Sequence, residues 1–503
     1  VYLAVILFLD YHGAGGQATI SWLNNNKGFQ LDGRNIDVKA KAVHARGGFR
    51  YLQPANDEPW LGILAGISTD DGSQAWRYFP ENLMGKDLVD YLSGAIQGGE
   101  ADNATLVYGG NPQLFPYKHN EGQFEVLVPL RNAKFAFQPD WPALTNLDIE
   151  LDFINDGLWM KTDGVNLGGV RASNLTAVIP DYSKEKLLID ADIKGPGKAV
   201  GPYFDETPLK DSLGATLQEL QLDGDVNARL HLDIPLNGEL VTAKGEVTLR
   251  NNSLFIKPLD STLKNLSGKF SFINSDLQSE PLTASWFNQP LNVDFSTKEG
   301  AKAYQVAVNL NGNWQPAKTG VLPEAVNEAL SGSVAWDGKV GIDLPYHAGA
   351  TYNIELNGDL KNVSSHLPSP LAKPAGEPLA VNVKVDGNLN SFELTGQAGA
   401  DNHFNSRWLL GQKLTLDRAI WAADSKTLPP LPEQSGVELN MPPMNGAEWL
   451  ALFQKGAAES VGGAASFPQH ITLRTPMLSL GNQQWNNPVS YTHLRAHETD
   501  QYL

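Results

Sequence analysis

The feature that most constrains the fold of this chain is an internal repeat. Residues 128–155 (VPLRNAKFAFQPDWPALTNLDIELDFIN) align without a gap with residues 247–274 (VTLRNNSLFIKPLDSTLKNLSGKFSFIN), 119 positions later, and eleven of the 28 positions are identical. At roughly 6% chance identity per position, only about two identities are expected. A chain with such a repeat folds as successive copies of one supersecondary unit.

Between turns, apolar and polar residues alternate with period two, which is the pattern of a β-strand with one buried face. Residues 226–236 and 381–385 are apolar at every second position. Dipeptides that favour tight hairpins interrupt the alternation at Asn237-Gly238, Asn357-Gly358 and Asp386-Gly387. The sequence therefore predicts a mainly β fold, a long antiparallel β-meander.

Four short segments instead place apolar residues three and four apart and predict helices at 83–96, 209–220, 322–330 and 447–458. Their starts lie 126, 113 and 125 residues apart, so short helices recur about every 120 residues. The predicted units are strands of a first unit at 16–82, a helix plus β-meander repeat unit at 83–204, a second at 205–320, a third at 321–445 and the start of a fourth at 446–487. Pro-rich stretches at 367–378 and 428–433 are expected to form extended connections or sheet edges.

The two end segments, residues 1–15 and 488–503, do not continue this pattern. Residues 1–9 form an apolar run too short to span a bilayer, which needs about 20 residues. Residues 488–503 (PVSYTHLRAHETDQYL) look like a translated sequencing adaptor. We expect both segments to be artefactual, and the rest to be the middle of a longer protein.

Composition excludes several functions. The 503 residues contain no cysteine, which removes disulfides, thiolate metal sites and cysteine nucleophiles and favours a location outside the cytoplasm. The net charge of −18 disfavours nucleic acid as a partner, because affinity for phosphate backbones comes from clustered Lys and Arg.

No catalytic motif stands out. The carboxylates Asp148, Glu150 and Asp152 share one strand face, but the second copy has Ser267, Lys269 and Ser271 there, so a solvated outer face is the better interpretation. The Gly-rich segment 195–201 lacks a phosphate-loop context and predicts a turn. Histidines occur singly at expected surface positions, including His231 and His403, and the pair His493 and His497 falls in the adaptor-like tail. We expect no enzyme activity, no metal site and no cofactor.

The opposite strand face stays apolar in both copies. From strand parity we select Phe135, Phe137, Leu147, Ile149, Leu151, Phe153, Leu230, Leu232, Ile234, Leu254, Ile256, Leu266, Phe270 and Phe272. Such a face is either an ordinary core or the lining of a lipid groove, and periodicity does not distinguish the two.

Specific residues resemble a known family. The segments 77–80 (RYFP), 95–99 (AIQGG), 135–155 and 367–378 (LPSPLAKPAGEP), together with Leu92, closely resemble AsmA-like proteins of the Gram-negative envelope, over about residues 16–487. These proteins are similar to repeating β-groove bridge proteins, in which an inner-membrane helix anchors a taco-like antiparallel sheet that crosses the periplasm.

The resemblance implies a function. Phospholipid acyl chains would move along the apolar groove between the inner and outer membranes, without chemistry or cofactor, in support of the outer-membrane permeability barrier. The chain would be a periplasmic segment of an inner-membrane-anchored protein, reaching both membranes through parts that lie outside it. The alternative is a structural β-rich scaffold or assembly factor for outer-membrane components, with a sealed apolar face.

Overall fold

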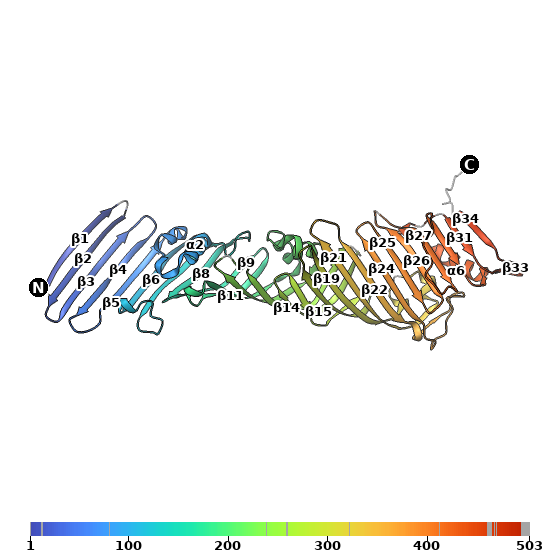
Figure 1. Cartoon of the computed structure of the whole chain (residues 1–503), viewed down its shortest axis with the longest axis horizontal. Coiled ribbons are helices and arrows are strands. Elements are labelled where there is room, and N and C mark those ends of the chain that lie inside the picture. The colour runs from blue at the N-terminus through green and yellow to red at the C-terminus, as the bar shows by residue number, and fades with distance from the viewer. Residues whose placement is uncertain are drawn as a thin grey trace, which may run out of the picture. The chain divides into compact units, whose positions relative to one another are not determined.

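The computed structural model describes residues 2–11, 14–79, 81–237, 239–257, 260–320, 322–411, 413–459, 465–466, 468 and 470–493. The chain divides into two compact units. Unit 1 comprises Val1–Leu249 and Ser271–Asn274, and unit 2 comprises Arg250–Phe270 and Ser275–Leu503. Both are built mainly of β-strands, as the sequence predicts, and in each unit consecutive strands lie side by side (Figure 1).

Unit 1 contains a run of antiparallel strands. These are β1 (Tyr2–Tyr11), β2 (Ala14–Asn25), β3 (Gly28–Lys39), β4 (His44–Pro54), β5 (Trp60–Thr69), β6 (Ile96–Gly110), β7 (Gln123–Phe135), β8 (Leu144–Ile154), β9 (Gly157–Leu167), β10 (Val170–Ile179), β11 (Lys186–Pro196), β12 (Leu220–Asp223) and β13 (Asp225–Pro235). Strands β14 (Thr242–Ile256) and β15 (Ser261–Ile273) contribute residues to both units.

Unit 2 continues the pattern from the turn after β15. Its main strands are β16 (Asp276–Ser279), β17 (Leu282–Trp286), β18 (Gln289–Glu299), β19 (Ala303–Trp314), β21 (Val334–Pro345), β22 (Thr351–Asp359), β24 (Ala380–Asn388), β25 (Ser391–Ala398), β26 (Asn402–Leu409), β27 (Leu414–Ala423), β28 (Gly436–Asn440), β30 (Ala465–Ser466), β31 (His470–Arg474) and β34 (Val489–His493). Two small sheets pair β20 (Leu330–Gly332) with β23 (Val363–Ser365), and β29 (Met444–Asn445) with β32 (Met477–Leu480) and β33 (Gln483–Asn486).

The meander ends at β27, where the pairing becomes parallel. Strand β28 runs parallel to both β27 and β31, and β30 runs parallel to β27. A parallel pair needs a long crossover, which the Pro-rich connection supplies between β27 and β28 and helix α6 (Gly446–Glu459) supplies between β28 and β31. The predicted antiparallel meander thus describes most of the sheet, and the parallel pairs at this end are an addition that the sequence did not indicate.

Helices occur at all four predicted places. At these places lie α1 (Glu81–Met84) with α2 (Lys86–Ala95), the π-helix η5 (Lys210–Gly214) with α4 (Ala215–Glu219), α5 (Glu324–Asn327), and α6. Helix α3 (Val200–Asp205) and the 3-10 helices lie outside the predicted ranges; the latter are η1 (Gly72–Tyr78), η2 (Pro112–Leu114), η3 (Tyr182–Lys184), η4 (Gly197–Ala199), η7 (Pro316–Lys318) and η8 (Leu360–Asn362). The Gly-rich segment 195–201, predicted as a turn, instead ends β11 and leads through η4 into α3.

Two predicted turns are also wrong. Asn357-Gly358 lies inside β22 and Asp386-Gly387 lies inside β24, so neither dipeptide reverses the chain. The site of the third, Asn237-Gly238, includes a residue outside the described part of the chain, although Asn237 itself is in a turn.

Three of the identities between the two copies of the repeat are asparagines with an unusual backbone conformation. Asn132, Asn146 and Asn155, and their partners 119 residues later, all have a left-handed backbone, with φ between 49° and 55°. Asparagine tolerates this conformation better than other residues that have a Cβ. The ladder between β7 and β8 shifts register next to Asn132, so the first of these positions is a β-bulge.

Side-chain hydrogen bonds at these positions are also shared. Asn155 Oδ1 accepts from the backbone N–H of Phe124 at 3.0 Å, and Asn274 Oδ1 accepts from that of Ala243 at 2.8 Å. In both copies the asparagine follows a long strand and bonds the beginning of the strand before it. Three of the eleven identities in the repeat therefore mark irregular backbone positions, where few other residues fit.

A pair of substitutions tests this interpretation. We expect Asn155→Ala to lower the stability of the fold more than Asn155→Gly, by about 1 kcal/mol, because both variants lose the hydrogen bond to Phe124 and only alanine is strained at positive φ. Urea unfolding of the two variants measures the difference. Equal stabilities would show that the left-handed backbone does not select asparagine there.

Candidate functional site

The apolar face of the first repeat copy is covered by helices. Leu88 and Leu92 of α2 and Met84 of α1 are at most 3% exposed, and they form one cluster with the inward side chains of β7 to β11. Figure 1 shows α2 lying against these strands. This part of the molecule is a closed hydrophobic core, which agrees with the spacing of apolar residues along α2.

Many of the residues predicted from parity belong to this core. The core contains Phe135, Leu147, Ile149, Leu151, Phe153 and Ile234, all buried, with Phe137 and Leu232 packed at its edge. Leu230, on the same strand as Ile234, is half-buried.

The residues from the second copy are less uniformly covered. Leu254, Ile256, Phe270 and Phe272 are half-buried, and only Leu266 is fully buried. The Phe270 ring contacts that of Phe295, with centroids 5.6 Å apart. Corresponding positions of the repeat thus differ in exposure, although their residue types are alike.

Unit 2 has another apolar face, most of which lies outside the residues predicted from the sequence. Side chains in direct register form two rows across ten strands, from β18 to β31. The first row is Val293, Leu310, Gly338, Leu356, Val383, Gly396, Phe404, Trp421, Leu439 and Leu473, and the second is Phe295, Val308, Val340, Ile354, Val385, Leu394, Ser406, Ala419, Val437 and Ile471. We call these two rows the unit 2 apolar face.

Most side chains of this face are half-buried and so keep some exposure. The one hydroxyl in the two rows, on Ser406, accepts from Trp408 Nε1 at 3.0 Å and donates to the backbone oxygen of Leu394 at 3.4 Å. Its hydrogen-bonding capacity is thus used within the sheet. The face consequently offers a continuous apolar surface that is not sealed as the unit 1 core is.

The opposite face of unit 2 is polar and internally hydrogen-bonded. The Asn309 amide donates to Asp294 Oδ1 at 2.7 Å, and the Asn382 amide donates to Asn357 Oδ1 at 2.7 Å, in each case across neighbouring strands. Strand parity therefore separates an apolar from a polar side over the whole unit, as period-two alternation predicts.

The prediction that His403 lies at the surface is wrong. This residue lies on the polar face of β26 but is only 5% exposed. The Pro-rich connection crosses this face, because Asn405 donates to the backbone oxygen of Pro429 and Arg418 to that of Pro432. His231 fits its expected place on the polar face of β13, where Nδ1 lies 2.8 Å from Asp190 Oδ1.

Helix α6 covers one end of the unit 2 apolar face. The ring of Trp449 on α6 contacts that of Trp421, with centroids 6.2 Å apart, and Trp449 Nε1 donates to the backbone oxygen of Ser369 at 3.0 Å. Farther along the helix, Lys455 forms an ion pair with Glu328. The helix is thus attached both to the sheet and to two connecting segments.

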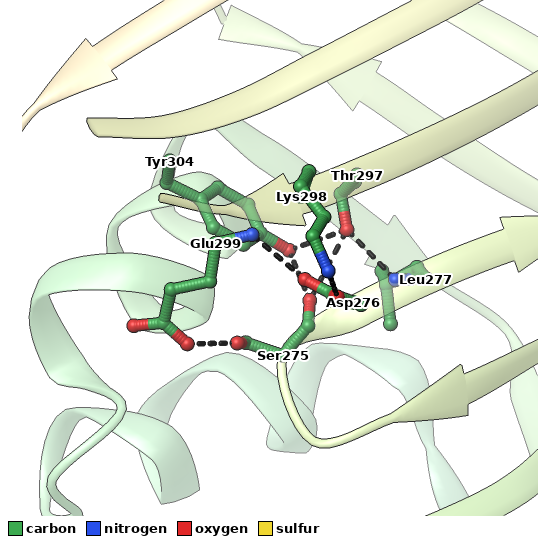
Figure 2. A network of polar contacts seen from close by, with 7 residues as sticks. All are labelled: Ser275, Asp276, Leu277, Thr297, Lys298, Glu299 and Tyr304. Carbon is green, nitrogen blue, oxygen red and sulfur yellow. Dashed lines mark hydrogen bonds and ion pairs between the residues drawn. The ribbon is translucent and has the colours of Figure 1, made fainter. Parts of the chain in front are cut away.

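A polar network lies at the margin of the same face, around the turn that leads into β16 (Figure 2). Tyr304, fully buried, donates to the backbone oxygen of Ser275 at 2.6 Å and contacts Thr297 Oγ1 at 2.8 Å. The Leu277 N–H donates to Thr297 Oγ1 at 2.8 Å. Strand β16 has one register pair with β18, so these side chains supply contacts that a longer ladder would otherwise make.

Charged groups complete the network. Asp276 forms an ion pair with Lys298, and Asp276 Oδ1 accepts from the Glu299 N–H at 2.7 Å. Burial raises the pKa of Asp276, but these hydrogen bonds outweigh it, so the pKa lies below its usual 3.8. Burial also raises the pKa of Tyr304 to about 12. The phenol is therefore neutral at physiological pH and available as a donor.

A scan against protein families matches the YhdP protein family over residues 11–501. The chain belongs to the YhdP family. YhdP proteins are AsmA-like proteins associated with the cell envelope, and the resemblance noted from the sequence is thereby confirmed. No solved structure matches the chain. Among the described residues, no helix of this YhdP-family chain is both long and apolar enough to cross a membrane.

Replacing one leucine by alanine in each apolar surface measures how differently the two surfaces are buried. Leu147→Ala, in the closed core, should cost about 2–5 kcal/mol, because it leaves a cavity as well as losing buried area. Leu394→Ala, on the half-buried unit 2 apolar face, should cost about 1 kcal/mol. Denaturant unfolding of both variants tests this, and equal losses would mean that the unit 2 face is as closed as the core.

The polar network should show a defined pH dependence. Because the pKa of Asp276 is lowered by folding, its charge stabilises the fold above about pH 4 and the contribution is lost as the pH falls through the folded pKa. The melting temperature of the wild type should thus exceed that of Asp276→Asn at about pH 6, and the gap should narrow toward about pH 3. A gap that does not change with pH would exclude this role for Asp276.

Proposed function

We propose that this chain is a segment of a bridge that carries phospholipids between the inner and outer membranes of a Gram-negative bacterium. The acyl chains would lie on the unit 2 apolar face while they cross the periplasm. Such transport would supply the outer membrane and so support its permeability barrier. No covalent step is involved, so we propose a non-enzymatic function without a cofactor.

The observation that supports this proposal most is the continuity of the unit 2 apolar face. Its rows pass through ten strands in unbroken register. Removing a methylene group from water is worth about 0.8 kcal/mol, so exposing an acyl chain of about 16 carbons would cost roughly 13 kcal/mol. On a continuous apolar surface, an acyl chain can move from strand to strand without being exposed to water over its whole length at one time.

Headgroup selection should be weak. The net charge of −18 gives little attraction for anionic headgroups, and neutral zwitterionic headgroups could remain in water. We propose that phospholipid is the partner of this segment, that nucleic acid is not, and that contact with either membrane is made by other parts of the protein.

The unit 1 core favours a second candidate function for that part of the chain. Because α1 and α2 cover the first repeat copy, its apolar face is occupied by protein side chains. A structural scaffold for outer-membrane components would use such a closed face throughout. The two candidates therefore make different predictions for unit 2.

A pair of charged substitutions on one strand tests the lipid proposal. The full chain would contain a photo-crosslinking amino acid in place of Val385 and be incubated with phosphatidylethanolamine/phosphatidylglycerol vesicles. We expect Leu394→Asp, directly opposite Val385 in register, to reduce lipid crosslinking at least tenfold, because a carboxylate is costly beside acyl chains.

The adjacent variant Thr395→Asp is the matched control. Thr395 lies on the opposite, polar face of the same strand and is also half-buried, so this variant should crosslink like the wild type. Lipid crosslinking that persists in Leu394→Asp, or that is absent in the folded wild type, would contradict the proposal and favour the scaffold.

A further inference from the structure

Three glycines on the apolar side of unit 2 lie within strands rather than in turns: two belong to the unit 2 apolar face and the third, Gly387, lies beside it. Gly338, Gly387 and Gly396 are on β21, β24 and β25. Each is in direct register with a large side chain of a neighbouring strand: Leu356, Tyr352 and Phe404, respectively. Glycine in a strand interior weakens the sheet and often marks a place where another group approaches closely.

The large side chains lie directly over these glycines. A Cβ atom added to Gly396 would be 1.9 Å from Cζ of Phe404, and one added to Gly387 would be 2.5 Å from Cζ of Tyr352. A Cβ at Gly338 would be 2.6 Å from Cδ2 of Leu356. The space that a side chain would fill at each glycine is therefore already occupied by its neighbour.

Side chains on a strand ordinarily stand roughly perpendicular to the sheet. Over a glycine, a ring can instead lie flat along the strands, so that it projects less from the sheet. A β-branched residue at Gly396 would occupy that space and force the Phe404 ring up, away from the sheet. The same reasoning applies to Gly387 with Tyr352.

We infer that Gly396 and Phe404, with the equivalent pairs at Gly387 and Gly338, set the clearance above the unit 2 apolar face through which an acyl chain passes. This inference rests on the proposed lipid transport and names the residues that determine its geometry. Phe404 and Tyr352 are then positioning residues for the acyl chain, and the glycines determine how far their side chains project.

A purely structural role is the competing explanation, because an aromatic ring packed over a glycine also stabilises a sheet. The two explanations differ in what happens when the ring is removed. If clearance matters, Phe404→Ala should compensate for a bulky residue at position 396. If only packing matters, removing the ring as well should make the protein less stable and restore nothing.

The test uses the full chain with a photo-crosslinking amino acid at Val383, in register with Gly396, or at the distant Val308. Phosphatidylethanolamine/phosphatidylglycerol vesicles supply the lipid. We expect Gly396→Val to lower crosslinking at Val383 at least fivefold and to leave Val308 unchanged. The double variant Gly396→Val/Phe404→Ala should return crosslinking at Val383 to within about twofold of the wild type.

Gly341→Val is the matched control, because Gly341 lies on the opposite face of β21, where its Cβ would meet the polar side chain of Asn353. It should not change crosslinking at either position. Should Gly396→Val fail to melt cooperatively, Gly338→Val at the flexible Leu356 replaces it, with Leu356→Ala as the compensating change.

Two results would overturn the inference: wild-type crosslinking in the bulky variant, or a double variant that remains defective. Both leave the proposed function in place, since the wild type still crosslinks lipid. Absence of crosslinking in the folded wild type at both positions would contradict the proposed function and the inference together.

Discussion

The structure depends on one constraint, which is that a β-strand with one apolar face must bury that face or give it an apolar occupant. Two solutions occur in this chain. In unit 1, α1 and α2 cover the part of the sheet that includes β7 to β11 with Leu88 and Leu92, and a closed core results there. In unit 2, most apolar side chains of the ten strands stay half-buried, and α6 contacts one of them, Trp421, through the ring of Trp449. The same alternation of apolar and polar residues thus contributes to a core in unit 1 and to a candidate binding surface in unit 2.

Sequence pattern predicted the strands because alternation is a local property of the chain. The four predicted helical segments were likewise visible in local spacing. The internal repeat was visible in eleven identities, among them Asn132, Asn146 and Asn155, which recur with their left-handed backbone. These asparagines are conserved between the copies for a backbone reason, not for a chemical one. Asp148 illustrates the point: its carboxylate accepts from the Asn132 N–H, and Ser267 does the same for Asn251.

What the sequence did not predict are properties that depend on distant segments. Leu151 and Phe270 occupy corresponding repeat positions, yet Leu151 lies in the closed core formed with α1 and α2, whereas Phe270 is half-buried. Gly358 and Gly387 were expected in turns because Asn-Gly and Asp-Gly pairs favour hairpins. Each is instead the next-to-last residue of a strand, and Gly387 accommodates the Tyr352 ring of the neighbouring strand. A local motif cannot show which ring lies across it.

Membership of the YhdP family and a continuous apolar face in unit 2 together support lipid as the occupant of that face. The measurement that tests this claim most directly is native mass spectrometry of the chain purified from a Gram-negative envelope without added lipid. The account predicts adducts with the masses of phospholipids, which dissociate on collisional activation. A folded chain that carries no lipid adduct, and gains none after incubation with phospholipid vesicles, would contradict it.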